Sequence, residues 1–304
     1  MRIGIDAMGG DFAPEVVVKG AIMALDSIAS DTTIVLFGEP TILETLLNNE
    51  GCNSSRIEIV ATEDVIEMDE HAVKAFRQKS NSSIVVGFQH LAEKSIDAFA
   101  SAGSTGAMMV GAMQLKREGT DVERPAIASV IPSVTGASVV LLDLGLNVDC
   151  KPAVLNHYAK LGAEFATREL GVKRPRVALL NIGKEATKGN LQARSAYKIM
   201  QTAGEEGEYN FVGNIEASHL FTAEVADVVV CDGFVGNVIL KLMEGLYTIN
   251  RNCGTTNSFW EGMDYEVRGG SPILGIDAPV VIGHGRSTAT AICNMILTTE
   301  RHAR

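Results

Sequence analysis

The sequence has few of the features that mark metal sites, disulfide frameworks or nucleic-acid binding. Its five cysteines form no C-x-x-C pair and no Cys/His pair at metal-binding spacing, which argues against a zinc site or a disulfide framework. Only 5% of the residues are aromatic, too few for a platform that stacks bases. The net charge of −11 disfavours binding to nucleic acid or adsorption to anionic lipid. We therefore expect free thiols in a reducing compartment, no metal and no nucleic-acid partner.

Targeting and nucleotide-binding signals are also missing. Asp6 stands where the apolar part of a signal peptide would begin. The longest uncharged stretch, 98–115, contains Ser101, Ser104, Thr105 and three glycines, so it predicts a buried strand and helix rather than a membrane span. No P-loop motif is present, and no G-x-G-x-x-G follows the first apolar run, which disfavours ATP-driven chemistry and an ordinary dinucleotide site. We predict a soluble, cytoplasmic protein.

Short apolar runs without strict alternation recur along the chain of 304 residues. Such runs are typical of a mostly parallel sheet that is covered on both faces. The predicted strands are 2–5, 33–37, 57–60, 96–100, 126–131, 139–142, 177–180, 228–231 and 280–282.

Helix-like segments separate these runs. One begins at Pro14, which suits the first helical position, and another ends at Gly171, a typical C-terminal signal. The predicted helices cover 14–29, 153–170, 191–203 and 236–247. The alternation predicts an α/β fold, a doubly wound three-layer α/β/α structure whose ligands bind at the carboxyl ends of the strands.

No linker or internal repeat divides the chain. We therefore expect residues 1–304 to form a single α/β catalytic domain, or two fused lobes. One polar stretch, 250–258, breaks the helical pattern, and it predicts a short exposed insertion over 248–268.

Three loops share one design, in which small residues and glycines follow a predicted strand. They are Ser101–Ala107, Asn181–Asn190 and Asp232–Asn237. Glycine lets the backbone approach a ligand, and free N–H groups followed by a helix N-terminus favour an anion. Three such loops on one chain indicate an enzyme that acts on a small phosphorylated or anionic substrate.

The N-terminal turn after the first predicted strand admits two interpretations. Asp6 and Asp11 flank two glycines there and are suited to bind a hydroxyl, an amine or a metal. Alternatively, Asp11 only caps the next helix. The residues alone do not separate the two.

A serine hydrolase is a competing hypothesis. The segment around Ser104 approximates a nucleophile elbow, and Asp232 and His284 follow it in the order found in α/β-hydrolases. The match is imperfect, because Ala102 stands where the motif has glycine. Capping explains Asp232 equally well, and a loop histidine bonded to the backbone explains His284.

The remaining loop residues are weighed in the same way. Lys188 stands beside Gly189 and Asn190, a position suited to clamping phosphate, whereas Lys184 is better explained as a solvated surface lysine. Asn237 is explained either by capping or by contact with a substrate.

Taken together, these segments resemble the phosphate acyltransferases of bacterial phospholipid synthesis, the acyl-ACP:phosphate acyltransferases of the PlsX family. The resemblance runs in order through nearly the whole chain. Its matching stretches are 5–11, 101–107, 124–126, 141–145, 147–152, 180–183, 188–190, 213–216, 229–234, 236–237, 269–270 and 283–285.

The resemblance implies a reaction, a fold and partners. Inorganic phosphate attacks the thioester of long-chain acyl-ACP, the acyl carrier protein being the acyl donor, and gives acyl phosphate without a cofactor. The implied fold is the α/β/α fold of phosphotransacetylases and isopropylmalate dehydrogenases, in a homodimer. The product would supply a membrane glycerol-3-phosphate acyltransferase of phospholipid biosynthesis.

The chemistry assigns roles to the matching positions. Gly103, Ser104, Thr105 and Lys188 are expected to bind phosphate, because the site must offset its charge and hold it near the carbonyl. Asn214 and Asn237 are expected to donate to the carbonyl or to position the acyl thioester, and Asp232 to orient the network. The other expected members of the site loops are Asp6, Asp11, Asn190 and His284.

Some positions depart from the family pattern. The family commonly has Asn at the position of Ser104 and a small residue at that of Leu146. Between Gly245 and Gly269 many members carry long basic, apolar helices associated with membrane contact and carrier docking, whereas this span is short and polar. Neither function is assigned to it, so peripheral membrane contact stays open. Candidate docking residues for the acidic carrier are Arg168, Lys173, Arg174 and Arg176, or Lys116 and Arg117.

Two further alternatives are a dehydrogenase on the related fold and a non-catalytic scaffold for the membrane acyltransferase. A dehydrogenase would need a nicotinamide site and usually clustered metal-binding aspartates, and the sequence shows no such cluster. Loss of phosphate binding would favour the scaffold.

Overall fold

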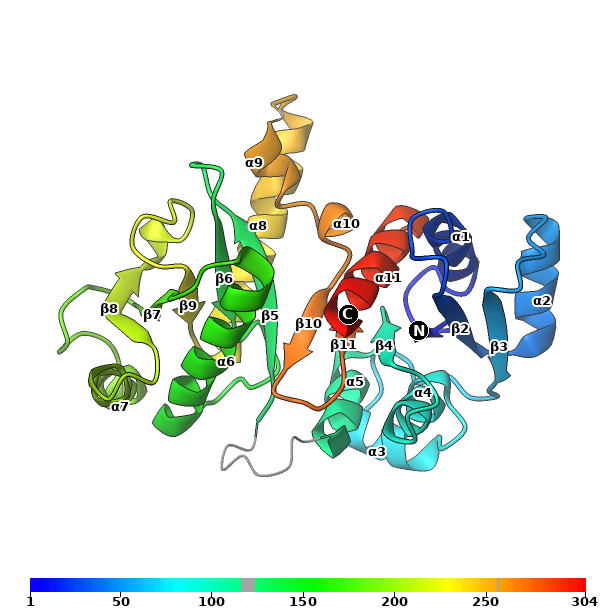
Figure 1. Cartoon of the computed structure of the whole chain (residues 1–304), viewed down its shortest axis with the longest axis horizontal. Helices are drawn as coiled ribbons and strands as arrows, with labels where there is room; N and C mark the ends of the chain where they lie inside the picture. Colours follow the sequence, from blue (N-terminus) through cyan, green and yellow to red (C-terminus); the bar gives the residue numbers. More distant parts are fainter. Residues whose placement is uncertain (116–123, 256) are drawn as a thin grey trace. The chain divides into compact units, whose positions relative to one another are not determined.

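The computed structural model describes residues 1–115, 124–255 and 257–304. Lys116 and Arg117, two of the candidate docking residues, lie outside this part of the chain. The described residues divide into two compact units, each containing a mostly parallel sheet flanked by helices (Figure 1). The terminal unit consists of two segments of sequence, one beginning at Met1 and one running from Tyr265 to Arg304. The central unit is the part of the sequence between these two segments.

Six strands form the sheet of the terminal unit, in the order β3-β2-β1-β4-β11-β10. All neighbouring pairs are parallel except β10 with β11. The strands are β1 (Arg2–Asp6), β2 (Thr33–Gly38), β3 (Ile57–Ala61), β4 (Ala98–Ser101), β10 (Ser271–Leu274) and β11 (Val280–Ile282).

Helices cover both faces of this sheet. In Figure 1, α1 and α11 lie on one side of the strands and α3, α4 and α5 on the other. Their bounds are α1 (Glu15–Ala24), α2 (Pro40–Asn49), α3 (Ala72–Gln78), α4 (Ser83–Ala92), α5 (Thr105–Ala112), η1 (Met113–Leu115), α10 (Tyr265–Arg268) and α11 (Ala289–Ala303).

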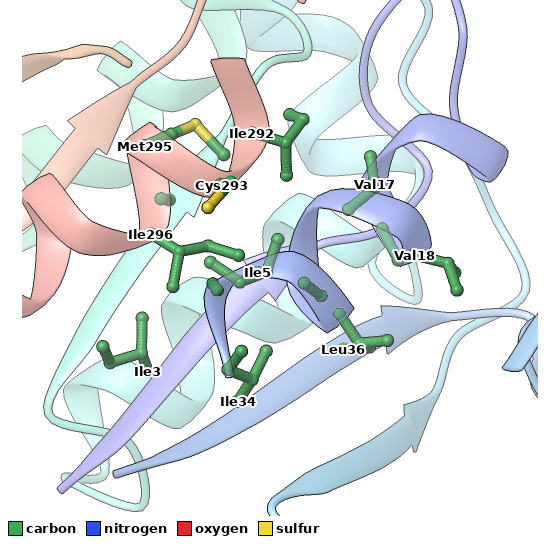
Figure 2. Close-up of a cluster of buried hydrophobic side chains, with 14 of the residues drawn as sticks. Ile3, Ile5, Val17, Val18, Ile34, Leu36, Ile292, Cys293, Met295 and Ile296 are labelled. Atoms are coloured by element: carbon green, nitrogen blue, oxygen red, sulfur yellow. The ribbon is translucent and has the colours of Figure 1, made fainter. Parts of the chain in front are cut away.

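Alternate residues of the central strands supply the two halves of this core. Ile3 and Ile5 of β1 pack with α1 and α11 in one apolar cluster (Figure 2). Gly4, between them, faces the other side, where a Cβ would lie 2.8 Å from Phe37 and 3.1 Å from Phe99. Because both faces are buried, the strand is a continuous apolar run.

The central unit has the strand order β5-β6-β9-β7-β8, with β5 and β6 antiparallel and the other pairs parallel. Helix α6 packs against β6, β9 and β7, and α7 packs against β8. The elements are β5 (Ala126–Pro132), β6 (Ser138–Leu142), α6 (Pro152–Leu170), β7 (Arg176–Asn181), α7 (Leu191–Glu205), β8 (Asn210–Glu216), η2 (Ala217–His219), β9 (Val228–Val230), α8 (Gly233–Asn252) and α9 (Ser258–Glu261).

The predicted α/β/α class is confirmed, and each predicted strand overlaps an observed one. Two strands, β8 and β10, are missing from the sequence prediction. Helix α1 ends at Ala24, five residues before the predicted end. Helix α8 continues to Asn252, so the polar stretch predicted as a loop from residue 250 begins inside a helix.

Candidate active site

In the terminal unit, predicted site residues meet at the carboxyl ends of β1 and β4. These strands are neighbours whose connections leave in opposite directions, which is where ligands bind in open α/β sheets. The Ser101 hydroxyl donates a hydrogen bond to Asp6 Oδ2 at 2.6 Å and accepts one from the Gly103 N–H at 2.9 Å. Asp6 is 1% exposed. Burial raises the pKa of its carboxyl, and hydrogen bonds from Ser101, Ser83, Met8 and Gly9 partly offset this. Asp6 therefore links the turn after β1, through Met8 and Gly9, to the loop after β4, through Ser101.

Glycines allow these loops to approach backbone to backbone. A Cβ on Gly9 would lie 2.1 Å from Asp6 Oδ2 and 2.9 Å from the Gly103 backbone. The Asp11 N–H donates to the Gly285 carbonyl at 2.8 Å, which brings in the loop that carries His284. Asp6, Asp11, Gly103, Ser104 and His284 therefore belong to one cluster of three loops.

The serine hydrolase hypothesis gains no support from this cluster. The Ser104 hydroxyl accepts the Ala107 N–H at 3.4 Å as the N-cap of α5, and Ser104 is 5% exposed. His284 accepts the Arg286 N–H at Nδ1, and its ring stacks on Tyr265 at 4.7 Å. Asp232 lies in the central unit and caps α8. Thr105, at the start of α5, has an exposed side chain suited to contact an incoming anion.

A pocket of about 490 Å³ lies in the central unit, at the carboxyl ends of β7 and β9. These two strands are adjacent, and the chain runs from β7 outward to β8 before it returns to β9, so this is a second switch point. The wall is mostly apolar and consists of Leu155, Leu179, Leu180, Asn181, Ile182, Gly189, Asn190, Gln192, Ala193, Ala217, Cys231, Asp232, Val235 and Ile239.

Two predicted site residues, Asn190 and Asp232, line this pocket as N-caps. Asn190 Oδ1 accepts the Ala193 N–H at 2.8 Å, and Asp232 Oδ1 accepts the Val235 N–H at 2.8 Å. The capping interpretation of Asp232 is therefore correct. Because both caps lie in the wall, the start of α7 at Asn190 and the start of α8 at Asp232 border the pocket. Lys188, Asn214 and Asn237 do not belong to the wall.

Lys188 and Asn214 lie on either side of the loop that follows β7. The side chain of Lys188 is exposed, and its carbonyl accepts a hydrogen bond from Asn181 Nδ2 at 3.2 Å. Asn214 of β8 is 5% exposed and donates through Nδ2 to the Glu185 carbonyl at 2.9 Å, while its Oδ1 has no partner in residues 1–115, 124–255 and 257–304. Asn214 thus supports the loop that presents Lys188.

Asp143, to which the sequence analysis gave no role, organises the loop that follows β6. Its Oδ1 accepts the N–H groups of Ile127 at 3.0 Å and Leu146 at 3.2 Å. Its Oδ2 accepts the Asn147 N–H at 2.7 Å and Asn147 Nδ2 at 3.4 Å. An acid that directly follows a strand, ahead of Gly145 and Asn147, is the pattern in the sequence that marks such a turn.

This loop holds the start of α8 in place and supplies the hydrogen-bond partner of Asn237. The Gly233 N–H donates to the Asn147 carbonyl at 2.8 Å, and Asn237 Nδ2 donates to the Leu144 carbonyl at 3.1 Å. Gly145 has a φ of +134°, and a Cβ there would lie 2.9 Å from Asn237 Nδ2. Through this Nδ2 hydrogen bond, Asn237 anchors the start of α8 to the loop after β6.

The cysteines near the site do not form a nucleophile. Burial, reinforced by Asp143, raises the pKa of the Cys150 thiol to about 11. Burial also raises the pKa of Cys231 well above its ordinary value. Both thiols remain protonated at neutral pH, so no thiolate forms beside the pocket.

Within the described residues, no group of three histidines, cysteines or acidic side chains is arranged to hold a metal ion. None of the helices described is long and apolar enough to span a membrane.

Comparison with known proteins identifies the family of the chain. The family described as "Fatty acid synthesis protein" matches residues 1–253. A phosphate acyltransferase from Halothermothrix orenii is 42% identical over 97% of this chain and 93% of its own length. One from Dictyoglomus thermophilum is 39% identical over 99% and 94%. The chain belongs to the phosphate acyltransferase family. The resemblance inferred from the motifs, and with it the prediction of an enzyme of this family, is confirmed.

Solved structures agree on the fold. A phosphotransacetylase from Streptococcus pyogenes has a TM-score of 0.69 at 18% identity, covering 100% of this chain and 94% of that chain. A branched-chain phosphotransacylase from Enterococcus faecalis V583 has a TM-score of 0.67 at 16% identity, covering 100% and 99%. A 4-hydroxythreonine-4-phosphate dehydrogenase from Burkholderia phymatum has a TM-score of 0.53 at 15% identity, covering 99% of this chain and 97% of that chain. These likenesses show the shared fold.

Proposed function

We propose that this protein forms long-chain acyl phosphate from acyl-ACP and inorganic phosphate and so feeds phospholipid synthesis. The observation that carries the proposal is family membership over 99% of the chain and 94% of a relative named phosphate acyltransferase, which spans both loop clusters. A phosphate oxygen attacks the thioester carbonyl, the tetrahedral intermediate collapses, the C–S bond breaks and the carrier leaves as a thiolate that takes up a proton. No covalent enzyme intermediate is required.

Lys188 is the proposed phosphate clamp. Its side chain is exposed, and in the described part of the chain no carboxylate pairs with its ammonium group. The glycine-rich loop at Gly103, Ser104 and Thr105 leads into α5. Because the N-terminus of a helix carries a partial positive charge, this loop is proposed to bind phosphate as well. Asn190 and Asp232 hold the starts of α7 and α8 beside the pocket, where developing negative charge is favoured.

The test of the reaction is phosphate-dependent formation of acyl phosphate from palmitoyl-ACP, trapped with hydroxylamine as the hydroxamate. Product that requires both phosphate and acyl-ACP supports the proposal. A folded protein that gives no product with any acyl donor would overturn it.

Replacing Lys188 by Ala should lower kcat/KM for phosphate by about 100-fold, because a charge that offsets the phosphate is removed. Lys184→Ala is the matched control, since Lys184 is another exposed lysine of the same loop. Steady-state kinetics with varied phosphate separate the two. Equal kinetics for the two variants would remove Lys188 from the site.

Three of the candidate carrier-docking residues, Lys173, Arg174 and Arg176, are not retained. The Arg176 guanidinium is engaged by Asp227 at 2.8 Å and by backbone carbonyls. Lys173 and Arg174 are exposed, but they precede β7 at its amino end, whereas the pocket lies at its carboxyl end. Six residues of strand separate the ends by about 20 Å. These residues are therefore not proposed to dock a carrier that delivers its acyl group into this pocket.

A homodimer is proposed through α8. Val238, Leu242, Leu246 and Ile249 recur at helical spacing on this helix and are 53%, 60%, 38% and 61% exposed. A long apolar stripe of this kind marks an interaction surface, and a second copy offers the same stripe. We expect light scattering to give a dimer that Leu242→Glu dissociates. A monomeric wild type would contradict this proposal.

A further inference from the structure

One polar atom in the wall of the pocket has no partner among the described residues. It is Nε2 of Gln192, the second residue of α7, which is buried and makes no hydrogen bond to this part of the chain. The neighbouring polar groups are engaged, because Asn190 and Asp232 cap helices and Asn181 bonds to the Ile182 N–H and the Lys188 carbonyl. A buried amide donor is normally paired, so this atom requires an acceptor that a ligand can supply.

The rest of the wall determines what kind of ligand fits. Leu155, Leu179, Val235 and Ile239 give it an apolar surface, and the Cys231 thiol stays neutral. Such a surface disfavours a free phosphate dianion, because its charge would lose hydration without a counter-charge. It favours a long apolar group that carries one hydrogen-bond acceptor. The volume of about 490 Å³ is in the range for small-molecule sites.

We infer that this pocket receives the acyl chain of the substrate and that Gln192 donates a hydrogen bond from Nε2 to the acyl carbonyl oxygen. This inference rests on the proposed function, because the acyl thioester is the substrate that combines a long apolar chain with one carbonyl. When phosphate attacks the carbonyl carbon, the C=O electron pair moves onto this oxygen, and the hydrogen bond strengthens as its charge grows. The pair returns when the C–S bond breaks.

The first test replaces Gln192 by Leu. The matched control is Gln201→Leu on the exposed face of the same helix, where Gln201 Nε2 donates a hydrogen bond to Glu205. We expect Gln192→Leu to lower kcat by about 100-fold, because a donor to the oxyanion is lost. Its melting temperature should be unchanged or higher, because an unpaired buried amide is removed. A purely structural glutamine would show the opposite pattern, namely a lower melting temperature with kcat preserved.

The second test changes the volume of the pocket. Ala193→Leu extends a side chain into the pocket, and Ile239→Ala enlarges it. With acyl donors of increasing length, each buried methylene should improve binding by about fourfold until the pocket is full. We expect the gain in affinity to stop at a shorter acyl chain in Ala193→Leu than in wild type, and at a longer acyl chain in Ile239→Ala. The preferred acyl-chain length should therefore change in opposite directions in the two variants.

Binding is measured separately from turnover, by calorimetry with octanoyl and dodecanoyl thioesters of N-acetylcysteamine in the absence of phosphate. If wild type makes acyl phosphate but the three pocket variants match it in kcat and chain preference, the pocket inference is overturned and the proposed function stands. If wild type binds the thioesters, and Ala193→Leu weakens only the longer one, the pocket inference stands even when no acyl phosphate forms. Failure of wild type to bind either thioester overturns the inference.

Discussion

Asp143→Ala is expected to lower the free energy of unfolding by about 3 kcal/mol, a large share of the roughly 5–15 kcal/mol that holds a domain together. The N–H groups of Ile127, Leu146 and Asn147 would each lose the carboxylate that accepts them. All these groups are buried in the central unit, where an unpaired donor is costly. Urea unfolding followed by circular dichroism measures the change.

The control for this substitution is Asp149→Ala in the same loop, because Asp149 is exposed and should change the stability by less than about 0.5 kcal/mol. Asp143→Asn should give an intermediate loss, since the amide retains one accepting oxygen. Equal stability of Asp143→Ala and Asp149→Ala would show that the loop does not depend on this carboxylate.

The pH dependence of the same variant has a definite sign. Burial raises the pKa of Asp143 above 3.8, and the donors from Ile127, Asn147 and Leu146 offset this only in part. The folded state therefore holds the proton more tightly than the unfolded state. The contribution of the group to stability is complete below the unfolded pKa and is lost as the pH rises through the folded pKa. The destabilisation by Asp143→Ala should accordingly be larger near about pH 4 than near about pH 7.

The sequence predicts those parts of the fold that local pattern determines. Continuous apolar runs predict the buried strands. Gly171 predicts the end of α6 at Leu170 correctly, whereas the predicted start at residue 153 lies one residue after the observed start at Pro152. Strand β8 is missed because it lies at the sheet edge and mixes Asn210, Gly213 and Asn214 with its apolar residues. Strand β10 is missed because it is short and contains Pro272, which is unusual inside a sheet.

For the candidate site, too, the sequence predicts one part, the location of the loops, and not the other, the contacts of each side chain. Strand ends followed by glycines predict where the loops gather, so Asp6, Ser104 and His284 lie in one cluster and Asn190 and Asp232 line one pocket. What each side chain does depends on contacts between distant segments. Asn237 bonds to a carbonyl 93 positions away, and Asn214 to one 29 positions away. Local pattern carries no information on such pairs, and the unpartnered amide of Gln192 emerges only from the packing around it.

Gly236→Ala is expected to destabilise the protein by at least about 3 kcal/mol and to reduce acyl phosphate formation sharply. A Cβ at this position would lie 1.8 Å from the Asp143 carbonyl oxygen and 2.9 Å from its carbonyl carbon. These are backbone atoms of the loop that Asp143 holds in place, so they cannot move aside as the end of a flexible side chain can. The start of α8 would have to shift, and with it Asp232 and Val235 in the wall of the pocket.

The matched control lies on the same helix. Gly245 is exposed, and a Cβ there would meet no atom of the described residues within 4 Å. Gly245→Ala should therefore stabilise the protein by about 0.5–1 kcal/mol, because alanine loses less conformational freedom than glycine in a helix. Chemical unfolding and hydroxamate trapping on both variants measure the contrast. If Gly236→Ala behaved like Gly245→Ala, the close contact between α8 and the Asp143 loop would not exist in solution, and the link between this loop and the pocket would fail with it.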